Sequence, residues 1–453
     1  MNGIQHIRSV YFLGIGGIGM SALARYFISR NVSVSGYDKT ETSLTKQLEL
    51  EGMAIHYDEN IELIDKSADL VIYTPAIPAT HRELVYFQKE NIPLLKRSDV
   101  LGMITENSFN ICVAGTHGKT TTSAMIAHLL RATGYGANAF LGGIASNYDT
   151  NFWSSENDVC VVEADEYDRS FLKLSPDIAI ITAMDPDHLD IYGTAEKMEE
   201  AFIDFTKRIR CKGILFSKYG LKRTGELVAD QHQTYAARDE SADIFAQNLQ
   251  MNNGSYHFDC QMPGRTIAGL VLNMGGMHNL ENAVAAIAVA ARLNIAEEKI
   301  REAVASFRGV KRRFEYVVKN EQLVFIDDYA HHPEELRALI NGAKDLFPAK
   351  KCTVIFQPHL FSRTKDLAEG FAEVLSIADE TVLLPIYPAR ELPMPGVESE
   401  MILSKLTNAV HCIKDKNELP AWLESQQTEL LILAGAGDID TMVEPLKKIL
   451  LNN

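Results

Sequence analysis

The segment that most constrains the fold is GTHGKTTT, residues 115–122, which follows a short apolar run at 111–114. A helix is predicted after it, through Arg131, so the order is strand, glycine loop, helix. Backbone N–H groups at such a helix start cradle phosphate oxygens. Lys119 brings a positive charge to the terminal phosphates, and the Thr120 hydroxyl can ligate Mg²⁺. We therefore predict a loop that binds ATP.

This loop departs from the common phosphate-loop pattern at one position. The pattern GxxxxGK[ST] requires a glycine at 113, where this chain has Val113. The alternative is a structural turn that binds no ligand. It is disfavoured because Gly118, Lys119 and Thr120 all stand where phosphate binding needs them.

The first forty residues predict a second nucleotide-type unit. A strand (9–13), a glycine loop (Gly14, Gly16, Gly17 and Gly19), a helix (20–30) and a strand (32–36) precede Asp38. Glycines allow close approach to a pyrophosphate, and a carboxylate about 20 residues on can accept from a ribose hydroxyl. The pattern does not say which nucleotide binds, and a turn without ligand is the alternative.

Two further strands are predicted in this first unit, at 69–73 and 92–95. Thr74 follows the former, and Lys96 and Arg97 follow the latter. A ligand at the carboxyl ends of these strands would contact Thr74 and Arg97. The alternative for the two cations is solvated surface, which is common for charged side chains.

Acidic residues follow two strands of the central unit. The strand at 158–162 runs into Glu163, and the strand at 178–183 runs into a loop with His188. Both side chains are candidates to join Thr120 at a metal ion. Carboxylate and hydroxyl suit Mg²⁺, whereas imidazole alone suggests zinc or Mn²⁺. Solvated loops are the alternative.

Further on, His278 and Asn279 precede a helix predicted at 281–293, where they either bind a base or, more simply, cap the helix.

The last third of the chain predicts a third parallel sheet. Its strands at 323–326, 352–356, 381–384 and 430–434 each end in polar residues. Carboxyl ends of parallel strands meet at one edge of a sheet, so these residues predict a site there. The candidates are Asp328, Tyr329, His331, His359 and Arg363.

Composition narrows the classes of function. A length of 453 residues predicts two to four domains, and 44 Lys and Arg against 60 Asp and Glu give a net charge of −16. That charge disfavours nucleic-acid binding. The six cysteines are scattered, which predicts buried thiols in a reducing cytosol. The first apolar stretch is too short for a membrane segment, so we expect a cytoplasmic protein with no membrane partner.

Seven motifs, in order along nearly the whole chain, resemble the Mur ligases. They are GTHGKTTT at 115, VVEADEYD at 161, DPDHLD at 185, HNLENA at 278, GVKRRFE at 309, DDYAHHP at 327 and FQPH at 356. The resemblance implies three α/β domains. They are an N-terminal Rossmann-like domain (1–106), a central phosphate-loop ATPase domain (107–310) and a C-terminal Rossmann-like domain (311–453).

The resemblance also implies ligands for each domain. UDP-N-acetylmuramate is expected at the first glycine loop, so that the loop holds a UDP pyrophosphate and not NAD. Mg²⁺, with Mn²⁺ as a possible substitute, is expected near Thr120, Glu163 and His188. Residues expected around ATP are Gly115, Thr116, His117, Gly118, Lys119, Thr120, Thr121, His278, Asn279, Asn282, Arg313 and Asp328. Tyr329, His331, His359 and Arg363 are expected around L-alanine and the acyl phosphate, and the expected catalytic residues are Lys119, His188, His331, His359 and Arg363.

The activity implied is ATP-dependent ligation of L-alanine to the lactyl carboxylate of UDP-N-acetylmuramate, in peptidoglycan precursor synthesis. Leu360-Phe361 stands where this branch often has Arg-Tyr, and residues 202–205 lack the lysine that sister ligases carbamylate. One alternative is the recycling ligase that attaches a tripeptide; Gln357-Pro358-His359, in place of Glu-Pro-Arg, favours alanine. An NAD-dependent dehydrogenase and a non-catalytic nucleotide sensor are the alternatives from other classes.

Overall fold

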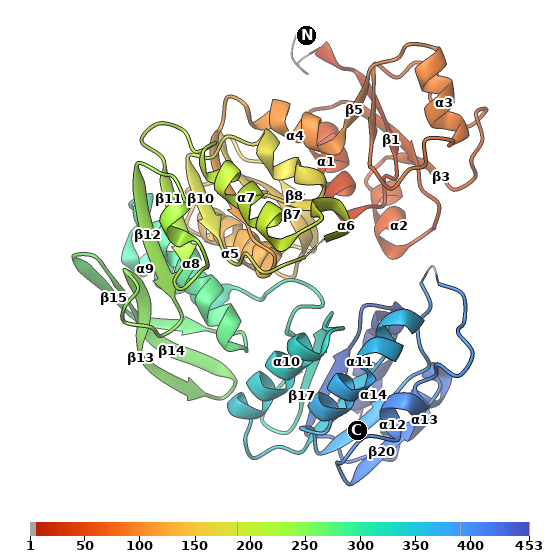
Figure 1. The fold of residues 1–453 in the computed structure, drawn as a ribbon, viewed down its shortest axis with the longest axis vertical. Helices are drawn as coiled ribbons and strands as arrows, with labels where there is room; N and C mark the ends of the chain where they lie inside the picture. The colour runs from red at the N-terminus through yellow and green to blue at the C-terminus, as the bar shows by residue number, and fades with distance from the viewer. Residues whose placement is uncertain (1–5, 188, 390, 453) are drawn as a thin grey trace. The chain divides into compact units, whose positions relative to one another are not determined.

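The computed structural model describes residues 6–187, 189–389 and 391–452, whose strands form three sheets (Figure 1). The first sheet is parallel throughout, in the order β3-β2-β1-β4-β5. Its strands are β1 (Ser9–Leu13), β2 (Ser33–Tyr37), β3 (Ala54–His56), β4 (Leu70–Tyr73) and β5 (Leu94–Lys96). The helices between and after them are α1 (Ile18–Ser29), α2 (Ser43–Leu50), α3 (Arg82–Lys89) and α4 (Arg97–Thr105).

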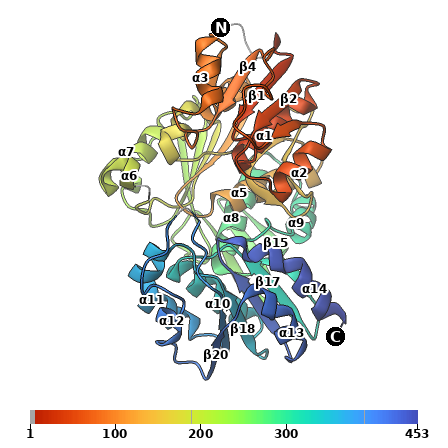
Figure 2. The same cartoon turned by 90° about the vertical axis from the view of Figure 1, so that its right-hand side faces the viewer.

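Alternation along β1 supplies both faces of the first sheet with apolar side chains. Val10 and Phe12 belong to a core that includes residues of α1, and Tyr11 and Leu13 belong to a second core with Phe87 of α3. Both views place α1 and α3 on opposite sides of this sheet (Figures 1 and 2). Burial on both faces explains why β1 reads as a continuous apolar run.

The second sheet has the order β15-β14-β13-β12-β11-β10-β6-β9-β7-β8. Strands β6 (Phe109–Ala114), β9 (Val159–Glu163), β10 (Ile178–Ile181), β11 (Ile214–Lys218) and β12 (Gln231–Ala236) are parallel neighbours. Strand β7 (Asn138–Ala145) is parallel to β9 and antiparallel to β8 (Thr150–Trp153). The remaining strands are β13 (Ile244–Asn252), β14 (Ser255–Met262) and β15 (Arg265–Leu272). The helices are α5 (Lys119–Ala132), α6 (Leu189–Tyr192), α7 (Ala195–Thr206), α8 (Met277–Arg292) and α9 (Glu297–Ser306), with a 3₁₀ helix at Tyr167–Lys173.

The third sheet has the order β16-β17-β21-β18-β19-β20. Its strands are β16 (Glu315–Lys319), β17 (Val324–Asp328), β18 (Cys352–Phe356), β19 (Glu380–Leu383), β20 (Val410–Ile413) and β21 (Leu430–Ala434). Its helices are α10 (Pro333–Leu346), α11 (Phe361–Leu375), α12 (Glu400–Leu403), α13 (Leu419–Glu424) and α14 (Val443–Asn452). The core on one face joins Phe325, Ile355 and Leu433 of the sheet to Leu423 of α13 and Leu446 of α14.

Contacts between residues divide the chain into two compact units. One comprises Met1–Phe245, Cys260–Thr266 and Asn282–Ala303, and the other comprises Ala246–Asp259, Ile267–Glu281 and Val304–Asn453. The first sheet lies wholly in the first unit, and the third sheet lies wholly in the second unit. In the described part of the chain no helix is long and apolar enough to cross a membrane.

The three α/β sheets confirm the predicted fold class, and several details differ from expectation. Strands β1, β18 and β21 have the predicted bounds, but α8 begins at Met277, so His278 and Asn279 lie inside that helix and not before it. The third sheet is not purely parallel, because β16 pairs antiparallel with β17. Four of the six cysteines are buried, whereas Cys211 is exposed and Cys412 is half-buried.

Val113 is a core residue, which explains why a glycine is absent there. It lies in β6 between Ile180 of β10 and Glu163 of β9, and its side chain is fully buried. We predict that Val113→Gly lowers the free energy of unfolding of the first unit by roughly 2–4 kcal/mol, through lost burial and added backbone freedom. Urea unfolding measures this change. Val228→Gly at an exposed position is the control, and an equal loss in both variants would contradict the core role of Val113.

Candidate functional site

The phosphate loop joins the end of β6 to the start of α5. Gly118 has φ 81°, in the left-handed region, and a Cβ placed there would come within 2.9 Å of Asn282 Oδ1. Glycine thus provides both the turn and the space. Asn282, which was predicted to lie near ATP, therefore packs against this loop.

The Lys119 ammonium is held inside the loop by two acceptors. Its Nζ lies 2.6 Å from the Gly115 carbonyl oxygen and 2.8 Å from Glu166 Oε2. Burial raises the pKa of Glu166 and outweighs the opposing effect of Lys119. Glu166 is only 1% exposed, so its carboxylate interacts with Lys119 at low dielectric. The pair keeps the cation at the start of α5, where the terminal phosphates of ATP are expected.

The Thr120 hydroxyl lies beside Glu163, as predicted for a metal site. Thr120 Oγ1 donates to Glu163 Oε1 at 3.0 Å, and Glu163 Oε2 accepts from the Gly142 N–H at 2.9 Å. Both residues offer the oxygen ligands that Mg²⁺ prefers. His188, the third predicted ligand, lies outside the described residues. Within the described ranges, no group of three or more His, Cys, Asp or Glu side chains is arranged to hold a metal.

Neighbouring strands fix the remainder of the loop. Thr116 Oγ1 accepts from the Asp185 N–H at 3.2 Å, whereas His117 is exposed and Thr121 is buried. The Thr182 hydroxyl donates to the Ala114 carbonyl at 3.1 Å and also to the His117 carbonyl. Thr182 was not predicted as a site residue, although it holds the loop to β10.

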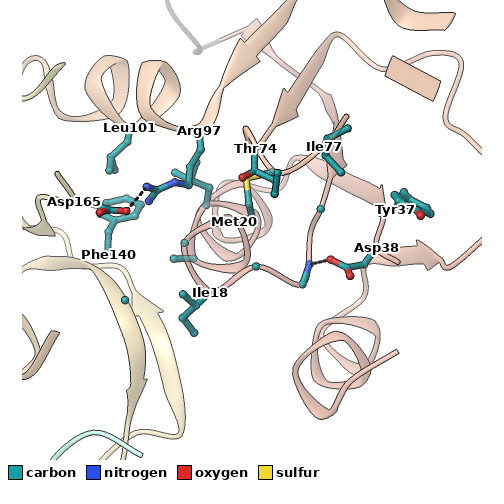
Figure 3. Close-up of a pocket in the computed structure, with 18 of the residues that line it drawn as sticks. Ile18, Met20, Tyr37, Asp38, Thr74, Ile77, Arg97, Leu101, Phe140 and Asp165 are labelled. Atoms are coloured by element: carbon teal, nitrogen blue, oxygen red, sulfur yellow. Dashed lines mark hydrogen bonds and ion pairs between the residues drawn. The ribbon is translucent and has the colours of Figure 1, made fainter. Parts of the chain in front are cut away.

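A cavity of about 680 Å³ lies at the first glycine loop (Figure 3). Every residue predicted to bind the sugar nucleotide lines it: Gly14, Gly16, Gly17, Gly19, Asp38, Thr74 and Arg97. Gly142 and Glu163 line it as well. The cavity therefore extends from the first glycine loop to the carboxylate that binds Thr120.

Asp38 and Arg97 shape the two sides of this glycine loop. Asp38 Oδ2 accepts from the Gly16 N–H at 2.8 Å, and Arg97 Nη2 lies 3.3 Å from Asp165 Oδ2 (Figure 3). A Cβ at position 19 would lie 2.6 Å from Arg97 Nη1, so Gly19 admits the guanidinium close to the start of α1. A cation beside a helix N-terminus suits a pyrophosphate. Lys96 forms a separate ion pair with Asp168 at 2.9 Å.

In the second unit, the predicted amino-acid site residues form one continuous group. The rings of Tyr329 and His331 lie 5.3 Å apart, and those of His331 and His359 lie 6.1 Å apart. Arg363 Nη1 lies 3.2 Å from His359 Nδ1, and Tyr387 stacks on His359 at 5.8 Å. Burial lowers the pKa of His331. Side chains that follow three different strands thus meet at one sheet edge, as predicted.

Two aspartates end strand β17 in different environments. Asp328 accepts from the backbone N–H groups of Phe314 (2.6 Å) and Ala330 (2.7 Å), and burial raises its pKa to about 6. Burial raises the pKa of Asp327 to about 8, and its Oδ1 has no hydrogen-bond partner among the described residues.

Arg313, which was predicted to lie near ATP, is exposed. Its neighbour Arg312 instead donates to the Gly435 carbonyl at 2.6 Å.

His278 and Asn279 lie in the first turn of α8. Asn279 is buried, and its Nδ2 donates to the Gly275 carbonyl at 2.7 Å. His278 lies against Gly276, where a Cβ would come within 2.5 Å of its Cε1. These contacts lie within the second unit, and their predicted part in ATP binding stays a prediction.

Three Mur ligase family models match the chain in succession. The model described as "Mur ligase family, catalytic domain" matches residues 9–108. "Mur ligase middle domain" matches 113–290, and "Mur ligase, glutamate ligase domain" matches 312–437. The chain belongs to the Mur ligase family. It is accordingly an ATP-dependent ligase that forms amide bonds.

Relatives along the full length support this membership. The UDP-N-acetylmuramate–L-alanine ligase of Parabacteroides distasonis is 48% identical, covering 99% of this chain and 98% of the relative. The enzyme of the same name from Flavobacterium johnsoniae is 47% identical over 99% of both chains. The crystal structure of UDP-N-acetylmuramate-alanine ligase from Thermotoga maritima has a TM-score of 0.84 and 30% identity, covering 99% of this chain and 100% of that one.

Several residues that shape this Mur ligase site were missed in the sequence. Glu166 and Thr182 hold the phosphate loop, and Arg312 anchors the loop after β21. The only available signal was their position next to the strand ends, because their partners are distant in the chain. Glu166 belongs to the motif VVEADEYD, where it was one acid among several.

The buried Asp327 predicts a pH dependence of stability in the second unit. Its pKa is about 8 when folded and about 4 when unfolded, so its stabilising effect is complete below pH 4 and is lost as the pH rises through 8. Asp327→Asn stays neutral. We predict that the free energy of unfolding of the wild type falls by up to about 3 kcal/mol more than that of the variant between pH 5.5 and pH 8.

Fluorescence of Trp422, in a Trp153→Phe background, measures this unfolding, because Trp422 packs against the core of the third sheet. Asp438→Asn is the control. Burial raises the pKa of Asp438, but hydrogen bonds from Lys416 and Gln357 outweigh this and hold it below the usual value. Asp438 is therefore ionised at both pH values. An identical pH dependence in wild type and Asp327→Asn would contradict the raised pKa.

Proposed function

We propose that this chain joins L-alanine to the lactyl carboxylate of UDP-N-acetylmuramate, through an acyl phosphate formed at the expense of ATP, in peptidoglycan precursor synthesis. The names of the full-length relatives support the two substrates. We place the reaction in the cytoplasm. We also propose the domain boundaries near residues 106 and 310.

The observation that carries this proposal is the cavity of the first unit. It begins at the first glycine loop and reaches Glu163, which hydrogen-bonds to Thr120 of the phosphate loop. A sugar nucleotide bound by its pyrophosphate at the first loop can extend its remaining groups toward the terminal phosphate of ATP. Positioning of this kind supplies much of the catalysis in phosphoryl transfer.

In the first step, the lactyl carboxylate attacks the γ-phosphorus of ATP, and the bond to ADP breaks. Lys119 neutralises charge that develops on the transferred phosphoryl group, while backbone N–H groups of the phosphate loop hold the leaving ADP. Thr120, Glu163 and His188 would hold Mg²⁺, which supplies further positive charge at the phosphates. The product is an acyl phosphate, whose carbonyl carbon is open to attack.

In the second step, the neutral amine of L-alanine attacks that carbonyl carbon and phosphate leaves. Arg363 is the proposed partner of the alanine carboxylate, since its guanidinium can bind both oxygens. The lowered pKa of His331 keeps its imidazole neutral near pH 7, so it can accept a proton from the alanine ammonium. His359, which contacts Arg363, orients that guanidinium.

The alternative functions have less support. A dehydrogenase gives no role to Lys119 or to the phosphate loop. The full-length relatives are named for alanine addition and not for a tripeptide.

Phosphate release tests the proposed reaction directly. The purified chain is incubated with UDP-N-acetylmuramate, ATP, Mg²⁺ and either single amino acids or the tripeptide. We predict that phosphate is released with L-alanine, and only when UDP-N-acetylmuramate, ATP and Mg²⁺ are all present. Lys119→Ala is predicted to lower kcat by at least about 10³-fold, because transition-state charge is left unneutralised. Lys173→Ala, which removes an exposed ion pair with Asp99, is the matched control. Release with the tripeptide but not with alanine would redirect the assignment.

Glu163→Gln tests the metal site. The change keeps the shape of the side chain but removes its charge, so we predict a rise of roughly ten-fold or more in the Mg²⁺ concentration for half-maximal activity. Glu226→Gln, on an exposed turn, is the control. An unchanged Mg²⁺ requirement in Glu163→Gln would remove Glu163 from the proposed set of ligands.

A further inference from the structure

Helix α10 begins beside the predicted amino-acid site, and its first turn carries two adjacent glutamates. Glu334 is 76% exposed and reaches toward Arg337, with 3.7 Å between Oε1 and Nε. Glu335 turns back toward the chain before the helix, where its Oε2 accepts from the backbone N–H groups of His331 at 3.0 Å and His332 at 3.1 Å. The second of these contacts caps the helix, because His332 is the N-cap residue. Of the two glutamates, it is Glu335 that contacts a residue of the predicted site.

The same carboxylate also approaches the imidazole of His331. Glu335 Oε2 lies 3.4 Å from His331 Nδ1, and Nδ1 lies 2.9 Å from the Tyr329 carbonyl oxygen. A carbonyl oxygen only accepts hydrogen bonds, so Nδ1 carries a proton, and the carboxylate favours the same tautomer. The neutral ring therefore presents an unprotonated Nε2. No hydrogen bond joins that nitrogen to the part of the chain that the structure describes.

Several groups around His331 act on its affinity for a second proton. Burial is the largest effect and lowers the pKa of the ring, and the charge of Glu335 is the largest effect that raises it. Arg363 of α11 and the neighbouring His332 also lower this pKa, because they repel a charged imidazole. The titratable ring of His359 lies 6.1 Å away. Glu335 thus limits how far burial and the nearby cations weaken this base. Capping of α10 alone would not require its approach to Nδ1.

We propose that Glu335 is a positioning residue for the ligation step: it fixes the tautomer of His331 and stabilises the imidazolium that forms when His331 takes a proton from the ammonium of the amino acid. This assignment rests on the proposed function. One N–H bond of the ammonium breaks and an N–H bond forms at Nε2, which leaves the lone pair of the amine free to attack the acyl phosphate. Nδ1 keeps its own proton, and the imidazolium then passes the transferred proton to water. A carboxylate behind an imidazole stabilises the charged ring without taking the proton itself.

Glu335→Gln tests this role, because an amide oxygen can still accept from the backbone N–H groups of His331 and His332 while the charge is gone. We expect the pKa of His331 to fall by about 0.5–1 pH unit, since Glu335 is close to the ring but partly exposed. Neutral His331 is the active form, so the acidic limb of the kcat/KM profile for L-alanine moves to lower pH by the same amount. The plateau of that profile falls roughly two- to five-fold, because a weaker base accepts the proton less readily.

Two measurements check these expectations. Nuclear magnetic resonance of isotope-labelled histidine titrates His331 directly, with His331→Asn identifying its signal, and phosphate release with L-alanine gives the pH profile. Glu334→Gln removes the same charge from the same helix turn and is the matched control, which leaves both the pKa and the profile unchanged. In His331→Asn the acidic limb is lost, and adding Glu335→Gln to that variant causes no further change in the profile.

Each other outcome overturns a distinct claim. An unchanged pKa of His331 in Glu335→Gln would reduce Glu335 to a cap of α10. A lowered pKa with an unmoved acidic limb would mean that another group takes the proton. Equal effects of Glu334→Gln and Glu335→Gln would show a general effect of charge at this helix start. Absence of alanine-dependent phosphate release by the wild type would instead contradict the proposed function, and the resonance titration would still decide whether Glu335 acts on His331.

Discussion

Two glutamates, one at the end of β9 and one just after it, hold the phosphate loop in place. Glu163 accepts from the Thr120 hydroxyl and Glu166 pairs with the Lys119 ammonium, so consecutive residues of α5 are fixed by a single segment of chain. Burying these charges is costly, and a buried ion pair is weak evidence of added stability. Its value is positional, because the pair and the Gly115 carbonyl fix the Lys119 ammonium at the start of α5. The same segment carries Asp165, which pairs with Arg97 at the start of α4, and Asp168, which pairs with Lys96 at the end of β5.

Parallel strands explain why so few residues suffice to organise the first unit. The carboxyl ends of β1 and β4 lie side by side, and so do those of β6 and β9. Each strand therefore delivers the residues after it to one edge, where loops from distant parts of the sequence meet. The cavity from Gly14 to Glu163 is a consequence of this geometry.

The sequence predicted the structural features that depend on local patterns, and it missed those that depend on tertiary contacts. Strand β1 and the phosphate loop follow from apolar runs and glycine spacing, and Thr120 beside Glu163 follows from the strand ends. The roles of Glu166 and Thr182 depend on partners more than 45 residues away, which no local pattern reveals. The predicted start of α8 lies after the observed start at Met277, because His278 and Asn279 are modest helix formers. Packing extends the helix through them. The antiparallel β16 has no signal in residue order, since alternation does not record strand direction.

The two glycine loops of this Mur ligase solve the same problem with cations from different sources. In the phosphate loop, Lys119 belongs to the loop itself and is fixed relative to the backbone N–H groups. The first loop carries no lysine, and Arg97 reaches it from the start of α4, through the space that Gly19 leaves. A cation built into the loop suits a phosphate that is transferred, because charge must be matched at one atom. A cation from a neighbouring helix suits a pyrophosphate that is only held. Arg97 is also paired with Asp165, which lies in the same segment as Glu163 and Glu166, the residues that position Thr120 and Lys119.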